Sequence, residues 1–113
     1  MRFVELQESD VELLATWISG EVWPYHARAR VDAGWFRDNS AQSFFGSGAR
    51  SFWITAPDSA PLGVVRVFDL SDMTPLVDLR VAEAARGQGI GTVALGWIIR
   101  FVFETFAETQ RLG

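Results

Sequence analysis

The stretch Arg86-Gly87-Gln88-Gly89-Ile90-Gly91-Thr92 decides how this chain folds, because it joins a strand pattern to a helix pattern. Ahead of it, residues 76–81 alternate as a strand does, and behind it residues 93–106 form an apolar run of helical length. Glycine lets the backbone take up positive φ and come close to a ligand. N–H groups at the start of a helix lack partners, and the helix dipole adds partial positive charge there. The stretch therefore predicts an anion-binding site.

Composition limits the class of protein. The chain has 113 residues and is 49% hydrophobic, which predicts one domain over residues 1–113 with its own core. The absence of cysteine excludes a disulfide scaffold, a thiolate metal site and a cysteine nucleophile. All ten basic residues are arginine, which excludes a P-loop lysine and Schiff-base chemistry.

Charge and hydropathy indicate the partners. The net charge of −4 argues against nucleic acid as the main partner and is compatible with a cationic substrate. No apolar run approaches the ~20 residues that a membrane span needs. The N-terminus has no signal-peptide pattern. We therefore expect a cytoplasmic protein that binds neither nucleic acid nor membrane.

The N-terminal half predicts one strand and two helical regions. Residues 3–6 fit a short strand, and Ser9 opens a helix in which Glu12 completes a capping box and Gly20 is the stop. Residues 31–45 are helical in a weaker pattern that residues 38–40 interrupt. These two regions are expected to pack on a sheet.

Three further strands follow, separated by short turns at prolines and aspartates. They are residues 51–56, 62–70 and 76–81, and the second is nearly continuous in valine and phenylalanine, which is typical of a central strand. Short connections predict an antiparallel meander. The fold class is therefore α+β, with helices packed on a mostly antiparallel sheet.

Aromatic residues crowd into the loop at residues 21–30. Trp23 and Tyr25 are candidate substrate contacts, and the alternative is that they only cover one end of the core. His26 is the only histidine, and without a nearby carboxylate pair it is a poor metal site. No metal is expected.

The helix after the glycines is apolar on more than one side. One face carries Ile90, Ala94, Trp97 and Phe101, and a second carries Leu95, Ile98, Val102 and Phe106. Such a helix is expected to be covered on more than one side, and the sheet covers one. We therefore expect exposed apolar surface, and self-association or completion by another chain to cover it.

The strand, glycine turn and helix resemble motif A of the GNAT superfamily of N-acetyltransferases. That motif is Gln or Arg, two residues, Gly, one residue, then Gly or Ala, and Arg86, Gly89 and Gly91 match it. The preceding order of elements also matches. The apolar helix and residues 110–112 look most like the subgroup that acetylates ribosomal-protein N-termini, although its glutamate early in the fourth strand is missing here.

The resemblance implies a GNAT-like, mostly antiparallel sheet with helices on both faces. It implies transfer of an acetyl group from acetyl-CoA to a primary amine, a protein N-terminus or a small molecule, by direct attack. The backbone N–H of Leu79 would polarise the thioester carbonyl. Asp78 is the candidate base, and Asp69 lies on the other relevant strand. Both acids also fit solvent-facing positions. The residues implied to hold acetyl-CoA are Leu79, Arg80, Val81, Arg86, Gly87, Gln88, Gly89, Ile90, Gly91 and Thr92.

The end of the chain departs from the family. Members continue with a further strand, a helix and a hairpin, and the helix commonly carries a tyrosine that protonates the leaving thiolate. This sequence stops at Gly113. The chain is thus expected to represent the N-terminal portion of the domain, lacking the C-terminal strands and helix, and it could be inactive alone. The alternative function is a non-catalytic CoA-binding or interaction module. A further alternative is that the glycines serve only a tight turn.

Overall fold

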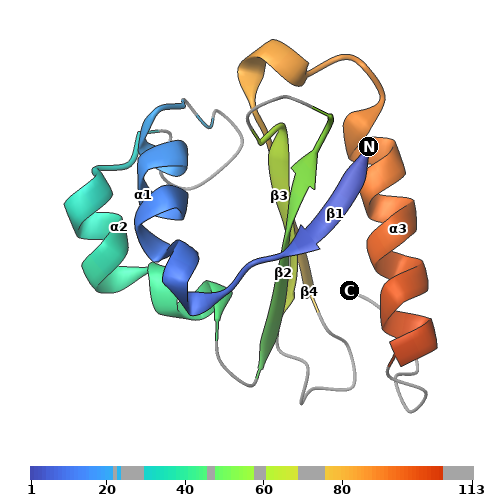
Figure 1. Ribbon diagram of the computed structural model, residues 1–113, viewed down its shortest axis with the longest axis horizontal. Coiled ribbons are helices and arrows are strands. Elements are labelled where there is room, and N and C mark those ends of the chain that lie inside the picture. The colour runs from blue at the N-terminus through green and yellow to red at the C-terminus, as the bar shows by residue number, and fades with distance from the viewer. Residues whose placement is uncertain (22, 24–29, 46–47, 58–60, 69–75, 106–113) are drawn as a thin grey trace.

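A computed structural model describes residues 1–21, 23, 30–45, 48–57, 61–68 and 76–105. In this part of the chain one antiparallel sheet has the strand order β1-β2-β3-β4. Helices α1 (Val11–Ser19) and α2 (Ala33–Asn39) lie on one face of the sheet and α3 (Ile90–Thr105) on the other (Figure 1). The strands are β1 Arg2–Glu5, β2 Ala49–Thr55, β3 Gly63–Phe68 and β4 Leu76–Val81. The α+β fold with helices on both faces is confirmed.

The helical segments follow the sequence closely, with differences at their ends. The α-helices are α1 Val11–Ser19, α2 Ala33–Asn39 and α3 Ile90–Thr105. The short 3-10 helices are η1 Glu8–Asp10, η2 Ala41–Phe44 and η3 Glu83–Ala85. The predicted interruption separates α2 from η2. The last helix starts at Ile90, within the glycine turn and ahead of the apolar run that begins at residue 93, and Gly89 O accepts a hydrogen bond from Val93 N at 3.1 Å.

The start of α1 differs from the predicted capping box. Gln7 N donates to Asp10 Oδ2 at 2.8 Å, so the reciprocal side chain is Asp10 and the cap lies before Ser9. Glu12 instead accepts a hydrogen bond from Arg37 Nη2 of α2 at 2.9 Å. The prediction placed this cap too late in the sequence, because a short 3-10 turn precedes the α-helix.

The sheet separates two hydrophobic cores, because successive strand residues face opposite sides. The core beneath α1 and α2 includes Trp53 and Val64 from the sheet. The core beneath α3 includes Phe52, Val65 and Val67 from the same two strands. β2 is buried along most of its length, as an inner strand between two helical layers must be.

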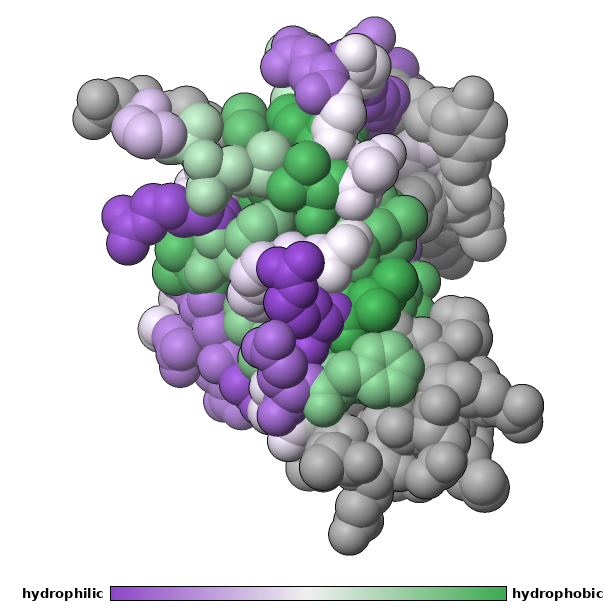
Figure 2. All heavy atoms as spheres, turned by 90° about the vertical axis from the view of Figure 1, so that its right-hand side faces the viewer, coloured by the Kyte–Doolittle hydropathy of each residue, from purple (hydrophilic) through white to green (hydrophobic). Residues whose placement is uncertain are grey.

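The outer side of α3 presents apolar side chains to solvent, as the sequence predicts, but the predicted second face was wrong in part. Ile98 and Val102 of that face are fully buried, because they lie on the same stripe as Ile90 and Ala94 and pack on the sheet. These side chains are 41 to 51% exposed and belong to Val93, Leu95, Ile99 and Phe103. Figure 2 views this side of the molecule, where hydrophobic surface gathers between bands of polar residues. In the described part of the chain, no helix is both long enough and apolar enough to cross a membrane.

Candidate functional site

The turn before α3 has the backbone conformation that its glycines predict. Gly87 and Gly89 both have φ of 78°, a region that residues with a side chain rarely adopt. A Cβ added at either glycine would meet nothing within 4 Å. These two glycines are therefore required by backbone conformation, and the space in front of them stays open for a ligand.

Gly91 has a different task from the glycines of the turn. A Cβ at Gly91 would lie 3.3 Å from Leu79 Cδ2, so glycine here lets the first turn of α3 pack closely on β4. Ile90, the first residue of α3, has a buried side chain, whereas the side chain of Thr92 is exposed. The start of α3 is thus held against the strand, with its free N–H groups beside the turn.

Arg86 ties the turn to the end of β4. Its Nε donates to Val81 O at 2.8 Å, and its guanidinium carbon lies 5.4 Å from the centre of the Trp23 ring. Gln88 contributes a longer contact, from Nε2 to Ala84 O at 3.4 Å. The positive charge of Arg86 therefore sits where β4 meets the glycine turn.

β4 is the edge strand of the described sheet, and its pairing shows which backbone groups face outward. Ala82 N donates to Leu62 O at 2.8 Å, so the hydrogen-bonded pairs of this ladder include Val64 with Arg80. Leu79 belongs to an alternate, non-bonded pair, and its N–H and C=O point away from β3. The N–H that the resemblance assigns to the thioester carbonyl is thus at the open edge, next to the glycine turn.

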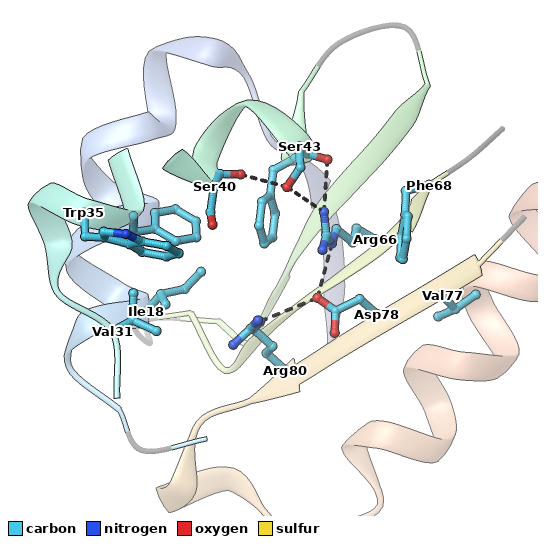
Figure 3. A pocket seen from close by; sticks show the side chains of 12 residues that line it. Ile18, Val31, Trp35, Ser40, Ser43, Arg66, Phe68, Val77, Asp78 and Arg80 are labelled. Atoms are coloured by element: carbon cyan, nitrogen blue, oxygen red, sulfur yellow. Dashed lines mark hydrogen bonds and ion pairs between the residues drawn. The ribbon is translucent and has the colours of Figure 1, made fainter. Parts of the chain in front are cut away.

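A pocket of about 450 Å³ lies on the α1 and α2 side of β3 and β4. Figure 3 shows Arg66, Asp78 and Arg80 projecting into it from the strands toward α2 and η2. Its other lining side chains are mostly apolar, and Trp35 and Phe68 lie on opposite sides of it. Asp78 and Arg80 flank Leu79 in β4, so the pocket borders the edge at which Leu79 N–H is presented.

Arg66 is held rigidly at one side of this pocket. Its Nε lies 3.2 Å from Asp78 Oδ2, and its Nη1 donates to Ser43 O at 3.0 Å and to Ser43 Oγ at 2.9 Å. The guanidinium carbon also lies 4.2 Å from the centre of the Phe44 ring and 4.5 Å from that of Phe68. Arg66 therefore has a carboxylate, a serine and two aromatic rings as partners.

Arg80 is less completely satisfied. Its Nε is 3.5 Å from Asp78 Oδ2, and its guanidinium carbon is 5.3 Å from the Trp23 ring centre. The side chain is only 15% exposed, yet Nε and Nη1 have no hydrogen-bond acceptor among the described residues. Burial lowers the pKa of Arg80, while Asp78 acts in the opposite direction, and the guanidinium stays protonated.

The candidate residues fall into three groups. The turn residues lie next to those of β4, and their role in holding acetyl-CoA stays a prediction. Trp23 is 2% exposed, donates from Nε1 to Ile18 O at 3.0 Å and packs under Arg80 and Arg86, outside the pocket lining, so its substrate contact stays a prediction. Tyr25, with His26 and Asp69, lies outside the described residues.

Asp78 lies in the pocket, but its surroundings differ from those expected of an unhindered base. Its Oδ2 is in ion-pair contact with both Arg66 and Arg80. Sequence reasoning missed Arg66, although the signal was present, because a lone charge within the apolar strand β3 needs a partner when one face is covered. No group of three or more His, Cys, Asp or Glu in the described ranges could hold a metal ion.

Comparison with known proteins identifies the family. The model of the acetyltransferase (GNAT) family matches residues 11–112, so the chain belongs to that family. No curated protein matches significantly.

Solved structures share the fold at low sequence identity. A domain from Methanocaldococcus jannaschii has a TM-score of 0.67 at 12% identity, covering 93% of this chain and 71% of its own. Spermidine/spermine N-acetyltransferase SpeG from Vibrio cholerae has a TM-score of 0.68 at 10% identity, covering 98% and 65%. A protein from Streptococcus mutans has a TM-score of 0.64 at 19% identity, covering 90% and 66%. The chain spans 65 to 71% of the length of these three solved chains.

Proposed function

We propose that the chain transfers an acetyl group from acetyl-CoA to a primary amine. The observation that carries this proposal is the placement of the positive-φ turn at Gly87 and Gly89 beside the open edge of β4. The turn supplies N–H groups and partial positive charge for a pyrophosphate, and Arg86 adds a full charge nearby. The edge supplies outward N–H and C=O groups for an extended pantetheine arm.

The proposed reaction is direct attack by the amine on the thioester. A carbon–nitrogen bond forms as the carbon–sulfur bond breaks, and the CoA thiolate leaves. Leu79 N–H, pointing outward from the sheet edge, is suited to stabilise the developing oxyanion. The amine must lose a proton before or during attack, and Asp78 stays the proposed acceptor, directly or through a water.

One observation favours the alternative of a CoA-binding module without catalysis. The Asp78 Oδ2 that would accept the proton is already paired with Arg66 and Arg80. Two neighbouring positive charges favour the ionised form of a carboxylate, so such a group positions arginines well and is a weaker proton acceptor. The alternative therefore predicts CoA binding with no turnover.

The acceptor and the partners also belong to the proposal. Fold similarity to spermidine/spermine N-acetyltransferase SpeG makes a polyamine one candidate acceptor, and the motif resemblance makes a peptide N-terminus another. A cytoplasmic location, and completion of the site by a second copy or another chain, remain predictions from the sequence.

Two measurements separate these functions. Calorimetric titration with CoA tests the donor site, and absence of both heat and a thermal shift would overturn it. Release of free thiol from acetyl-CoA, followed over a panel of amines, tests catalysis. Binding without thiol release by any amine would leave the CoA-binding module as the function.

A further inference from the structure

The described lining of the pocket beside β4 is positively charged, although the whole chain is negative. Its described lining contains two cations, Arg66 and Arg80, and one anion, Asp78, while the other lining residues are neutral. The net charge of the described lining is therefore +1, in a chain whose net charge is −4. A net positive lining disfavours a polycationic acceptor, because like charges repel where solvent screening is weak.

Arg80 is the less completely hydrogen-bonded of the two cations in this pocket, although it also contacts Asp78. Arg66 is the nearer partner of Asp78, at 3.2 Å against 3.5 Å for Arg80, and it is further fixed by Ser43. Arg80 Nε and Nη1 are buried without an acceptor among the described residues. A buried guanidinium with unmet N–H groups is destabilising unless a ligand or another group completes its hydrogen bonds.

From this geometry we propose that Arg80 binds a carboxylate of the acceptor, so that the substrate is a primary amine carrying a carboxylate and an apolar group, as an amino acid does. A planar guanidinium matches a carboxylate through two parallel hydrogen bonds. The aromatic side chains of Trp35, Phe36 and Phe44 line the same pocket and suit the apolar part of such a molecule.

The position of Arg80 in β4 relates this site to the reaction, and the inference rests on the proposed acetyl transfer. Arg80 follows Leu79 directly, and Leu79 N–H lies at the edge assigned to the thioester. A carboxylate held by Arg80 would keep the amine of the same molecule close to that edge. Arg80 thereby selects the acceptor, and Asp78 holds the two arginines in place.

The test compares phenylalanine with phenylalanine methyl ester, which keeps the amine and the ring but lacks the negative charge. Binding of each is measured by calorimetry to the full chain without CoA, and spermidine serves as the polycationic comparison. We expect phenylalanine to bind at least tenfold more tightly than its ester, since the carboxylate contributes charge-assisted hydrogen bonds. Equal affinities for acid and ester, or tighter binding of spermidine, would overturn the inference.

Variants assign the effect to Arg80. Arg80→Gln should weaken phenylalanine binding about tenfold or more and leave binding of the ester unchanged, and Arg80→Lys should recover part of the loss. The matched control is Arg100→Gln, which removes the same charge from the exposed side of α3 and should change neither. An unchanged phenylalanine affinity in Arg80→Gln would also overturn the inference, and the comparison of acid with ester on the unaltered chain does not depend on how the variant folds.

Failure of this inference is distinguishable from failure of the proposed function. CoA binding is titrated separately, at a site formed by the glycine turn and the backbone edge of β4, without the side chain of Arg80. One outcome is that CoA binds and thiol is released with amines that lack a carboxylate, while phenylalanine binds no better than its ester. That outcome supports acetyl transfer and overturns the carboxylate site. If phenylalanine binds through Arg80 but CoA does not bind, the result overturns the proposed CoA site and supports the carboxylate site.

Discussion

Replacing Gly89 by alanine tests the glycine turn, because the two expected effects of the substitution have separate causes. Gly89 has φ of 78°, and a Cβ there would meet nothing within 4 Å, so the variant suffers backbone strain without a clash. A left-handed conformation costs an alanine about 1–2 kcal/mol. For a chain of 113 residues this corresponds to a melting temperature lower by about 4 to 8 °C.

The matched control is Gly96→Ala, seven positions further along the same segment. Gly96 is exposed within α3, is not among the positive-φ glycines, and a Cβ there also meets nothing within 4 Å. Alanine in an exposed helix interior stabilises by about 0.5–1 kcal/mol relative to glycine. The same chemical change should therefore lower the melting temperature at residue 89 and raise it at residue 96.

CoA affinity is the second readout of this pair. Under the proposed function the N–H groups of the turn bind CoA, and relaxation of the turn in Gly89→Ala would change their direction. Loss of one hydrogen bond to a charged group is worth about 1.5–3 kcal/mol, or at least tenfold in affinity. Gly96→Ala should bind CoA like the unaltered chain. A Gly89→Ala variant that melts and binds CoA as the unaltered chain does would refute the assignment of this turn.

Three further predictions concern the layers around the site. Gly63→Ala would put a Cβ 2.4 Å from Arg80 O, so chemical denaturation should show a loss of about 1–3 kcal/mol, and an unchanged midpoint would contradict the close approach of β3 and β4. Trp97→Ala removes the ring that stacks on Phe3 at 4.3 Å between centroids and should cost about 3 kcal/mol, whereas Leu95→Ala at an exposed position should change stability by less than about 0.5 kcal/mol. The exposed apolar side of α3 should make the chain self-associate in sedimentation velocity, more weakly after Ile99→Glu, and a monomer at high concentration would exclude this.

Much of the fold was predictable because the alternation of apolar residues and the turn residues indicate the same elements that tertiary packing stabilises. The strand Leu76–Val81 has its predicted bounds, since alternation and flanking turns both define it. The positive φ of Gly87 and Gly89 follows from glycine at those positions between a strand and a helix. The capping box was misplaced because a 3-10 turn and an α-helix begin with similar residues.

The pocket was not predictable in the same way. Its polar side chains come from three elements, η2, β3 and β4, and are Ser43, Arg66, Asp78 and Arg80. Their proximity depends on the register of β3 against β4, which the sequence does not specify. The sequence placed Asp78 on a strand, but it carried no sign that two arginines share its carboxylate. Trp23 was a candidate substrate contact because it lies in an aromatic loop, and burial beneath the two arginines depends on the tertiary packing of α1.

The central claim is that CoA lies across the glycine turn and along β4, and amide chemical shifts test it most directly. In a titration of the isotope-labelled chain with CoA, we predict that the largest amide shifts occur at Gly87, Gly89 and Ile90, with a second group at Leu79. The amide shifts of β1, at the opposite edge of the sheet from β4, should stay unchanged. No saturable shift, or shifts confined to residues away from the turn and β4, would contradict the account.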